Sequence, residues 1–169
     1  MLSPMADLEL TRGRDDRRVF ELAGLGTLRV EGLFSRRATA DAGTATWTFD
    51  RAGFWRTTIR ATDAAGSVVG TFDPRALKRG GTLTWDAREL ELRPASLWKD
   101  RYALAAGDRE IAVLDGRSWG KRPVTITVDD PAAVDPGLLL FAAYVVRSLA
   151  EDSASAAGGA AAGATAATG

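Results

Sequence analysis

The sequence contains no cysteine and no histidine. Without cysteine, disulfide bonds, thiol catalysis and thiolate metal sites are excluded. Without histidine, the chain lacks the commonest general base and the commonest metal ligand, and every Ser-His or Cys-His arrangement is excluded. We therefore expect a protein that is not an enzyme and that uses neither a metal nor a cofactor.

An excess of charge of either sign is also absent. The 169 residues include 22 Lys and Arg and 22 Asp and Glu, so no overall field favours binding to nucleic acid. Residues 1–10 have neither the basic segment nor the apolar segment of a secretory signal. We expect a cytoplasmic protein that does not bind nucleic acid, and that meets the inner membrane face only peripherally. The residues do not indicate an oligomeric state.

One stretch near the C-terminus is apolar on every side. Asp135 can cap a helix and Pro136 suits its first position, and no charged residue occurs from 138 to 146. This pattern predicts a helix over 136–150 that is buried all round. A helix of about 15 residues is shorter than the ~20 residues that a membrane span needs, so we expect no transmembrane span.

Before this helix, short runs of residues alternate between apolar and polar, as is typical of strands buried on one face. Turn signals such as Ala-Gly and Asp-Gly separate the runs, and no second long helical pattern occurs. Regular short strands in meander order favour a β-sandwich or a barrel. The runs lie at 6–10, 19–23, 28–30, 36–41, 45–50, 55–61, 67–72, 83–85, 90–92, 101–105, 110–114 and 124–128.

The apolar helix favours the barrel. A closed sheet of twelve strands is ~24 Å wide, and its inward side chains leave ~12 Å, the width of one helix. We predict a mainly β fold: an antiparallel closed barrel of about twelve strands around the C-terminal helix. The alternative is a β-sandwich or open barrel with the helix outside. The barrel is expected over 17–150, with a loosely ordered segment at 1–16 and a disordered Ala/Gly-rich tail at 151–169.

This order of elements resembles the tubby-like C-terminal barrel superfamily. The superfamily includes tubby proteins, phospholipid scramblases and LURP-one-related proteins, and many of its members are bacterial. The resemblance implies a helix that runs through the barrel, phosphoinositide binding through basic surface residues as in tubby proteins, and membrane association as in scramblases. The chain lacks a scramblase-like acylation cysteine cluster and a match to the tubby basic motif. The likeness is carried by 46–50, Trp55, the strands of Trp85 and Trp98, 125–128 and 135–144.

Large apolar side chains fall at the inward positions of the expected strands and on the helix. Core packing is the simpler interpretation, and an aromatic cage formed by the inward tryptophans is the alternative. Trp98 and Trp119 lie near turns beside basic residues, where they would serve as membrane-interface anchors or pack at the rim. The expected core residues are Trp47, Phe49, Trp55, Trp85, Leu139, Phe141 and Tyr144.

Basic residues gather in turns. The cluster from Arg12 to Arg18 contains Asp15 and Asp16, so we interpret it as nearly neutralised. The other clusters would lie at the rims of a barrel, where two that converge could hold a lipid phosphate. The alternative is an ordinary solvated surface. The candidate lipid-headgroup residues are Arg75, Lys78, Arg79, Lys121 and Arg122.

Three aspartates, Asp129, Asp130 and Asp135, precede the helix in the place where scramblases carry a proposed calcium segment. Two prolines stiffen this segment and no bidentate glutamate follows, so a turn and a helix cap are the better interpretation. Together these patterns favour a non-enzymatic binding module that contacts anionic phospholipid or an unidentified protein. The alternative is a carrier that holds a small hydrophobic ligand inside its barrel.

Overall fold

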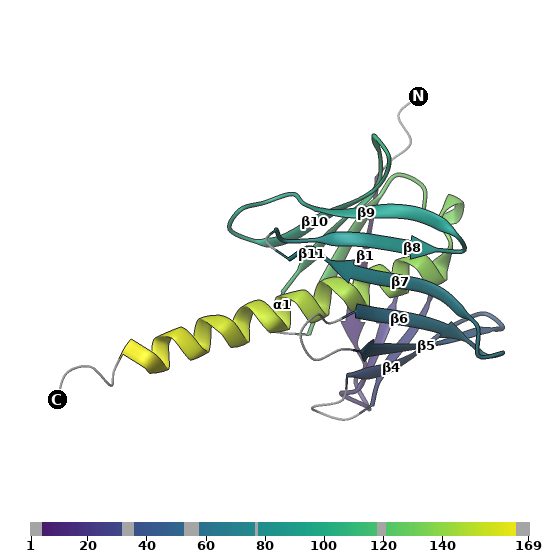
Figure 1. The fold of residues 1–169 in the computed structure, drawn as a ribbon. Helices are drawn as coiled ribbons and strands as arrows, with labels where there is room; N and C mark the ends of the chain where they lie inside the picture. Colours follow the sequence, from purple (N-terminus) through teal and green to yellow (C-terminus); the bar gives the residue numbers. More distant parts are fainter. Residues whose placement is uncertain (1–4, 32–35, 53–57, 77, 118–120, 165–169) are drawn as a thin grey trace.

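The computed structural model describes residues 5–31, 36–52, 58–76, 78–117 and 121–164, with the side chains of 159–164 excepted. Twelve antiparallel strands form one closed barrel in chain order, and β1 pairs with β12 to close it. The predicted fold is thus confirmed (Figure 1). The elements are β1 (Ala6–Arg12), β2 (Val19–Leu22), β3 (Gly26–Val30), β4 (Arg37–Ala42), β5 (Ala45–Ala52), β6 (Thr58–Asp63), β7 (Val68–Pro74), β8 (Gly81–Trp85), β9 (Arg88–Pro94), β10 (Asp100–Ala106), β11 (Arg109–Gly116), β12 (Val124–Val128), the 3₁₀ helix η1 (Pro131–Ala133) and α1 (Pro136–Ala164).

The first strand lies inside the segment that the sequence predicts to be loose. Leu10 pairs with Val124 of β12 on one side and with Leu22 of β2 on the other. Its side chain is fully buried, whereas those of Asp7 and Glu9 are exposed or half-buried. The barrel therefore starts at Ala6 rather than at 17. The alternation in this strand is weak because Leu8 and Leu10 are its only large apolar residues.

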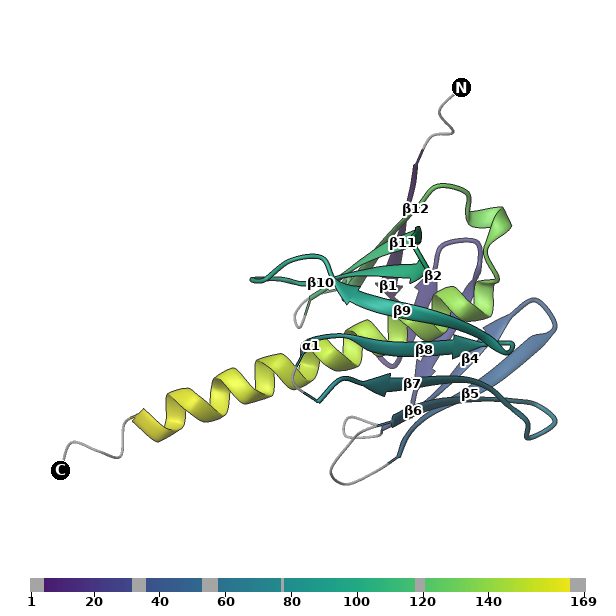
Figure 2. The ribbon, with the colours of Figure 1, turned by 45° about the horizontal axis from the view of Figure 1, so that its top comes forward.

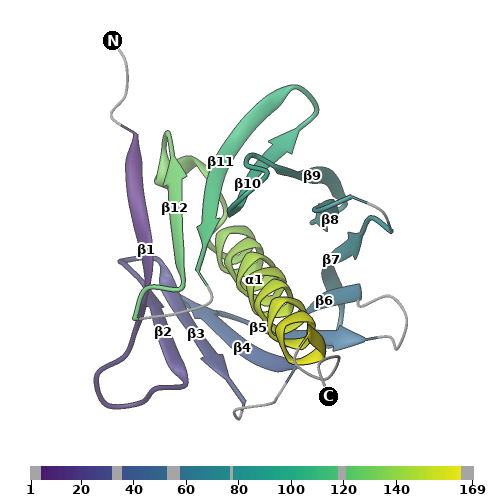
Figure 3. The same cartoon turned by 90° about the vertical axis from the view of Figure 1, so that its left-hand side faces the viewer.

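The helix α1 fills the core of the barrel. All side chains from Leu138 to Val146 are between 0% and 3% exposed. The helix contacts β10, β11 and β12 on one side and β3, β4 and β5 on the other. Figure 3, which looks along the helix, shows the strands arranged around it. An apolar helix and a ring of half-buried strands thus satisfy each other's need for burial.

The described residues include no helix that is both long enough and apolar enough to cross a membrane.

Two aspartates act as caps before the core helix. The Asp135 carboxylate accepts a hydrogen bond from the Gly137 backbone N–H at 2.7 Å and one from the Trp85 Nε1–H at 3.2 Å. Asp130 accepts from the Ala132 N–H and caps η1. These contacts agree with the cap interpretation, because each carboxylate satisfies a backbone donor that the helix start leaves free.

Tyr144 ties the helix to the barrel wall. Its hydroxyl donates a hydrogen bond to the Arg36 carbonyl oxygen at 2.7 Å, and its side chain is 3% exposed. Burial raises the pKa of this phenol to about 12, because the phenolate would lose its hydration. Since the ordinary pKa is ~10, this stabilisation is complete below pH ~10 and is lost as the pH rises toward 12.

The variant Tyr144→Phe should therefore change how stability depends on pH. At neutral pH it should lose about 1 kcal/mol with the hydrogen bond. Between pH 9 and 11 the free energy of unfolding of the wild type should fall by about 1.4 kcal/mol more than that of the variant. Urea unfolding at the two pH values measures this difference. Parallel pH profiles would contradict a buried, neutral Tyr144.

The helix continues beyond the predicted end at 150 and leaves the barrel as far as Ala164 (Figures 1 and 2). Alanine has the highest helix propensity, and no proline interrupts this segment. An ion pair between Arg147 and Glu151 at 2.8 Å supports the first turn outside the core. The buried half has already met the cost of nucleation, so the helix can extend without further core contacts.

The two rims of the barrel are set by its meander topology. All turns after odd-numbered strands lie at one rim, because neighbouring strands are antiparallel. The helix starts after β12, at the rim that carries the turns after even-numbered strands. It therefore leaves the barrel through the rim that carries the turns after odd-numbered strands. We name these the helix-exit rim and the helix-start rim. Their described turn residues are 13–18, 31, 36, 75–76, 78–80, 95–99, 117 and 121–123 for the helix-exit rim, and 23–25, 43–44, 64–67, 86–87, 107–108 and 129–135 for the helix-start rim.

Candidate functional site

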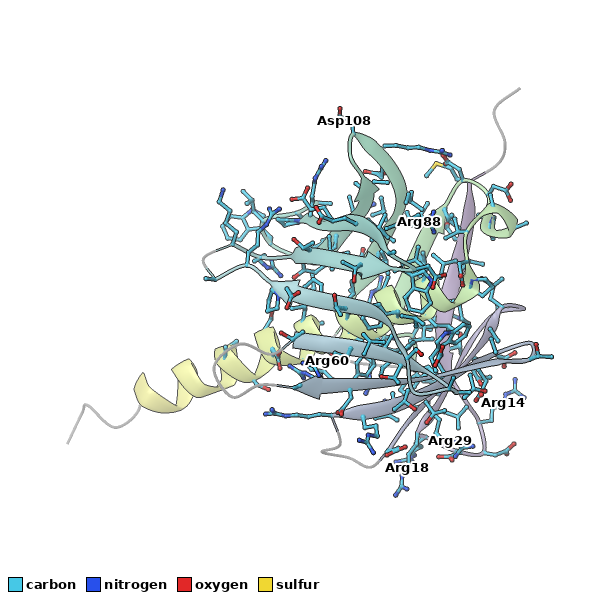
Figure 4. All side chains as sticks on the ribbon, turned by 45° about the vertical axis from the view of Figure 1, so that its right-hand side comes forward. Arg14, Arg18, Arg29, Arg60, Arg88 and Asp108 are labelled. Atoms are coloured by element: carbon cyan, nitrogen blue, oxygen red, sulfur yellow. The ribbon has the colours of Figure 1, made fainter. Side chains whose placement is uncertain are left out.

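The two rims carry opposite charge. The turns of the helix-start rim contain aspartates at 86, 108, 129, 130 and 135 and no lysine or arginine. Figure 4 labels Asp108 at the top of the view, and Arg14 and Arg18 at its lower right and bottom. A sequence with no net charge therefore folds into a molecule with a basic end. The exposed basic residues of the helix-exit turns are Arg14, Arg17, Arg18, Arg36, Arg75, Lys78, Arg79, Lys99, Arg117, Lys121 and Arg122.

The five predicted lipid-headgroup residues share this rim but form two groups. Arg75, Lys78 and Arg79 follow β7, and Lys121 and Arg122 precede β12, with β9 and β10 between the two turns. Three of the five are engaged in ion pairs: Arg75 with Glu91, Arg79 with Asp100, and Arg122 with Glu9 at 3.1 Å. In the described part of the chain, Lys78 and Lys121 form no ion pair.

A hollow of about 310 Å³ lies beside the β7–β8 turn. Its wall includes Arg75, Lys78 and Arg79, and the Arg79 guanidinium lies 5.7 Å from the centre of the Tyr102 ring. Asp152 of α1 also lines it. The ion pairs of Arg75 and Arg79 already neutralise much of the positive charge of this hollow. We therefore expect it to bind an anion only weakly.

A second hollow, of about 290 Å³, lies on the β1–β2 side of the helix and is far more basic. Five arginines line it, with Glu151 as the single carboxylate among the described lining residues. We name it the arginine pocket. Its lining residues are Arg12, Arg17, Arg18, Phe20, Val30, Arg51, Tyr144, Arg147, Ser148 and Glu151.

Strand alternation turns two of these arginines inward. Arg12 follows buried Leu10 at the same parity in β1, and Arg51 follows buried Phe49 in β5. Arg147 lies one turn after Tyr144 on α1. The side chains of Arg51 and Arg147 are only 13% and 17% exposed. Barrel wall and helix thus hold arginine side chains inside the mouth of the barrel, where charge is costly unless it is paired.

The pocket arginines are only partly paired. Arg51 forms an ion pair with Asp152 at 2.5 Å, and Arg147 forms one with Glu151 at 2.8 Å. The guanidinium groups of Arg12 and Arg147 lie 5.6 and 4.6 Å from the centre of the same ring, that of Phe20. Among the described residues, the buried Nε atoms of Arg12 and Arg51 have no hydrogen-bond partner.

Within the first basic cluster, Asp16 contacts Arg18 and an arginine outside the cluster. Asp16 accepts hydrogen bonds from the Arg18 backbone N–H and the Arg29 side chain, both at 2.9 Å. These contacts, the backbone one first, lower the pKa of Asp16. The Asp16 carboxylate therefore forms its ion pair with Arg29, which does not line the pocket, and its charge also acts on Arg18, which does. The inward parity of Arg12 and Arg51 is the sequence signal that identifies them.

The most exposed large apolar side chains also lie at the helix-exit rim. Among the described residues, Leu97 and Trp98 in the β9–β10 turn are 86% and 93% exposed, next to exposed Lys99. The sequence analysis identified Trp98 as a possible anchor but did not identify Leu97. Trp119, the other candidate anchor, lies outside the described residues.

The predicted core residues lie as follows. The side chains of Phe49, Trp85, Leu139, Phe141 and Tyr144 are buried. Trp47 is half-buried, with its ring centre 5.9 Å from that of Trp85. Trp55 lies outside the described residues. Phe141 contacts both Phe49 and Trp85, so these aromatic rings pack on the helix rather than around an open cage.

Comparisons of the chain with protein-family models, with curated proteins and with solved structures found no match. The likeness to tubby-like barrels therefore stays a prediction from the order of the elements.

Proposed function

We propose that the protein is a non-enzymatic module that binds anionic membranes peripherally through its helix-exit rim. The observation that carries this proposal is the separation of charge between the two rims. Basic side chains line the turns through which the helix leaves, and aspartates line the opposite turns. Each basic residue near an anionic surface contributes about 1 kcal/mol, so the module would approach with one rim first.

Leu97 and Trp98 support the same orientation. Exposed leucine and tryptophan side chains beside a lysine suit the boundary between headgroups and acyl chains, where indole rings are enriched. An anchor of this size adds apolar burial to the electrostatic attraction but cannot hold the protein permanently. Binding should therefore be reversible and sensitive to salt.

The protruding part of α1 leaves through this rim and would meet the same surface (Figure 1). Beyond Asp152 the sequence has no charged residue. This segment therefore neither attracts nor repels an anionic surface strongly. The rim turns are expected to dominate the affinity, and deletion of 153–169 should leave most of the binding intact.

Charge reversal at the rim should remove membrane binding. Lys78→Glu with Lys121→Glu changes two exposed residues without breaking an ion pair of the described chain. At about 1 kcal/mol for each charge removed and a similar repulsion for each charge added, the vesicle affinity should fall about 100-fold or more. Flotation with phosphatidylserine-containing and pure phosphatidylcholine vesicles, at low and high salt, measures the effect.

The matched control is Arg88→Glu with Arg109→Glu, two exposed arginines near the helix-start rim (Arg88 is labelled in Figure 4). It makes the same change in net charge and should retain most of the binding.

A second variant, Leu97→Ala with Trp98→Ala, should bind about tenfold more weakly at both salt concentrations, because the apolar contribution is not screened. Equal loss in the control pair, or no preference for anionic vesicles, would contradict the proposal and favour a protein partner.

The carrier alternative finds no support in the geometry. The side chains from Leu138 to Val146 occupy the space inside the barrel that a hydrophobic ligand would need.

A further inference from the structure

We propose that the arginine pocket is a binding site for a dianionic phosphate group, as carried by a phosphate monoester. The pocket lies inside the mouth of the barrel, between α1 and the wall formed by β1, β2, β3 and β5. It shares Arg17 and Arg18 with the helix-exit turns, whereas its other arginines, Arg12, Arg51 and Arg147, come from the barrel wall and α1. Phosphate binding by those three arginines does not require that the rim bind a membrane.

The charge of the arginine pocket is unbalanced. Five arginines line the pocket with one described carboxylate, that of Glu151. The guanidinium groups of Arg12 and Arg147 lie over the same Phe20 ring, where each repels the other. A bound dianion would relieve this repulsion, and it would do so more fully than a monoanion. Holding several cations together in a partly buried site costs free energy, and a bound anion would offset that cost.

The pocket arginines also have unused hydrogen-bonding capacity. Arg12 and Arg51 each keep a buried Nε–H that has no acceptor in the described part of the chain. Buried donors are almost always satisfied, so an unmatched pair at one site requires an explanation. A phosphate bound in the pocket would give the terminal N–H groups of these guanidiniums oxygen acceptors beyond the Asp152 carboxylate that pairs with Arg51. Arginine is suited to this role because its planar fork matches phosphate geometry.

The helix α1 supplies two carboxylates that would compete with a bound anion for the pocket arginines. Glu151 pairs with Arg147, and Asp152 pairs with Arg51. Both carboxylates are exposed, on the turn of α1 that has just left the barrel, whereas the side chains of their arginines are half-buried. These two carboxylates act as counter-ions of the arginines. A more highly charged ligand would compete with them for the same guanidinium groups and replace them.

The size of the pocket fits a ligand larger than the phosphate itself. Its volume of about 290 Å³ is at the small end of ligand pockets, which are ~300–1,000 Å³. Tyr144 and Val30 add an apolar part to the lining, so a small organic group attached to the phosphate would also find contacts.

The test is a titration of the full chain with inorganic phosphate and with glycerol 3-phosphate, followed by calorimetry and by thermal unfolding at constant ionic strength. We expect saturable binding and a rise in melting temperature, with sulfate, also a tetrahedral dianion, competing for the site and the monoanion chloride without effect. Arg12→Gln or Arg51→Gln should weaken the affinity about ten- to hundredfold, because each removes a charge-assisted contact. Arg109→Gln, which removes an equal charge from an exposed arginine near the opposite rim, should retain it.

One further variant separates binding from a merely structural role. Glu151→Gln removes the carboxylate that competes for Arg147, so it should tighten phosphate binding about two- to fivefold. This readout stays informative if the arginine variants fold poorly. An unchanged or weaker affinity in this variant would contradict the inference.

Vesicles distinguish the source of the phosphate. Phosphatidic acid carries a phosphate monoester, so vesicles that contain it should bind more tightly than phosphatidylserine vesicles of equal surface charge if the ligand is a lipid. That preference should disappear in Arg12→Gln. Saturable binding of soluble phosphate without this preference would assign a soluble ligand. Failure of the phosphate titration together with no preference for phosphatidic acid would overturn the site, whereas loss of phosphatidylserine binding alone would overturn only the membrane proposal.

Discussion

Replacement of Leu139 by aspartate is expected to abolish the folded state. Leu139 is fully buried in the middle of a barrel whose core the helix fills. A carboxylate there would have no partner and no water, at a cost of several kcal/mol added to the lost leucine packing. Since a domain of this kind is stable by only ~5–15 kcal/mol, most molecules should be unfolded or aggregated.

The expected observations are loss of the cooperative thermal transition and of dispersed amide signals in NMR spectra. A truncation that removes the chain from Pro136 onward should give the same result, because the strands would lose the surface that they cover. Deletion of 153–169 is the control, because its described side chains lie outside the barrel and are mostly exposed. It should leave the melting temperature nearly unchanged. A folded barrel in Leu139→Asp would mean that the helix is not part of the core.

Periodicity made the barrel predictable. Strands such as β8 and β12 alternate strictly, and the run from Leu138 to Val146 is apolar on all sides. Each pattern identifies which surface of its segment must be buried. The space inside a twelve-stranded barrel then matches the width of one helix. The first strand was underestimated because Leu8 and Leu10 give a short signal among polar residues. Its pairing with β12, far away in sequence, is what stabilises it.

The candidate site was harder to predict because it depends on contacts between distant parts of the chain. Arg12, Arg51 and Arg147 come from β1, β5 and α1 and meet only when the barrel closes around the helix. Their neighbours in sequence are misleading: Asp16 appears to neutralise the first cluster but pairs with Arg29. The inward parity of Arg12 and Arg51 was visible in the sequence. The length of the exposed part of the helix was not visible in the sequence, because its alanines form no apolar pattern that indicates burial against a core.

Replacement of Gly137 by alanine should destabilise the protein although alanine is the better helix former. Gly137 is the second residue of α1. A Cβ atom built on it would lie 2.6 Å from Cζ2 of Trp85 and 2.7 Å from Cζ2 of Trp47. Contacts below 3.0 Å require a neighbour to move. Trp85 cannot move freely, because it is 1% exposed, donates to Asp135 and packs against Phe141.

The sign of the effect separates two physical contributions. Helix propensity alone would make Gly137→Ala more stable by up to about 1 kcal/mol. Overpacking between the two indole rings costs about 1–3 kcal/mol and should outweigh that gain. Gly158→Ala is the matched control, because a Cβ there meets nothing within 4 Å on the exposed part of the same helix. It should raise helicity slightly without changing the free energy of unfolding. Urea unfolding of both variants decides the matter: a Gly137→Ala protein as stable as the wild type would show that the tryptophans do not enclose the start of the helix.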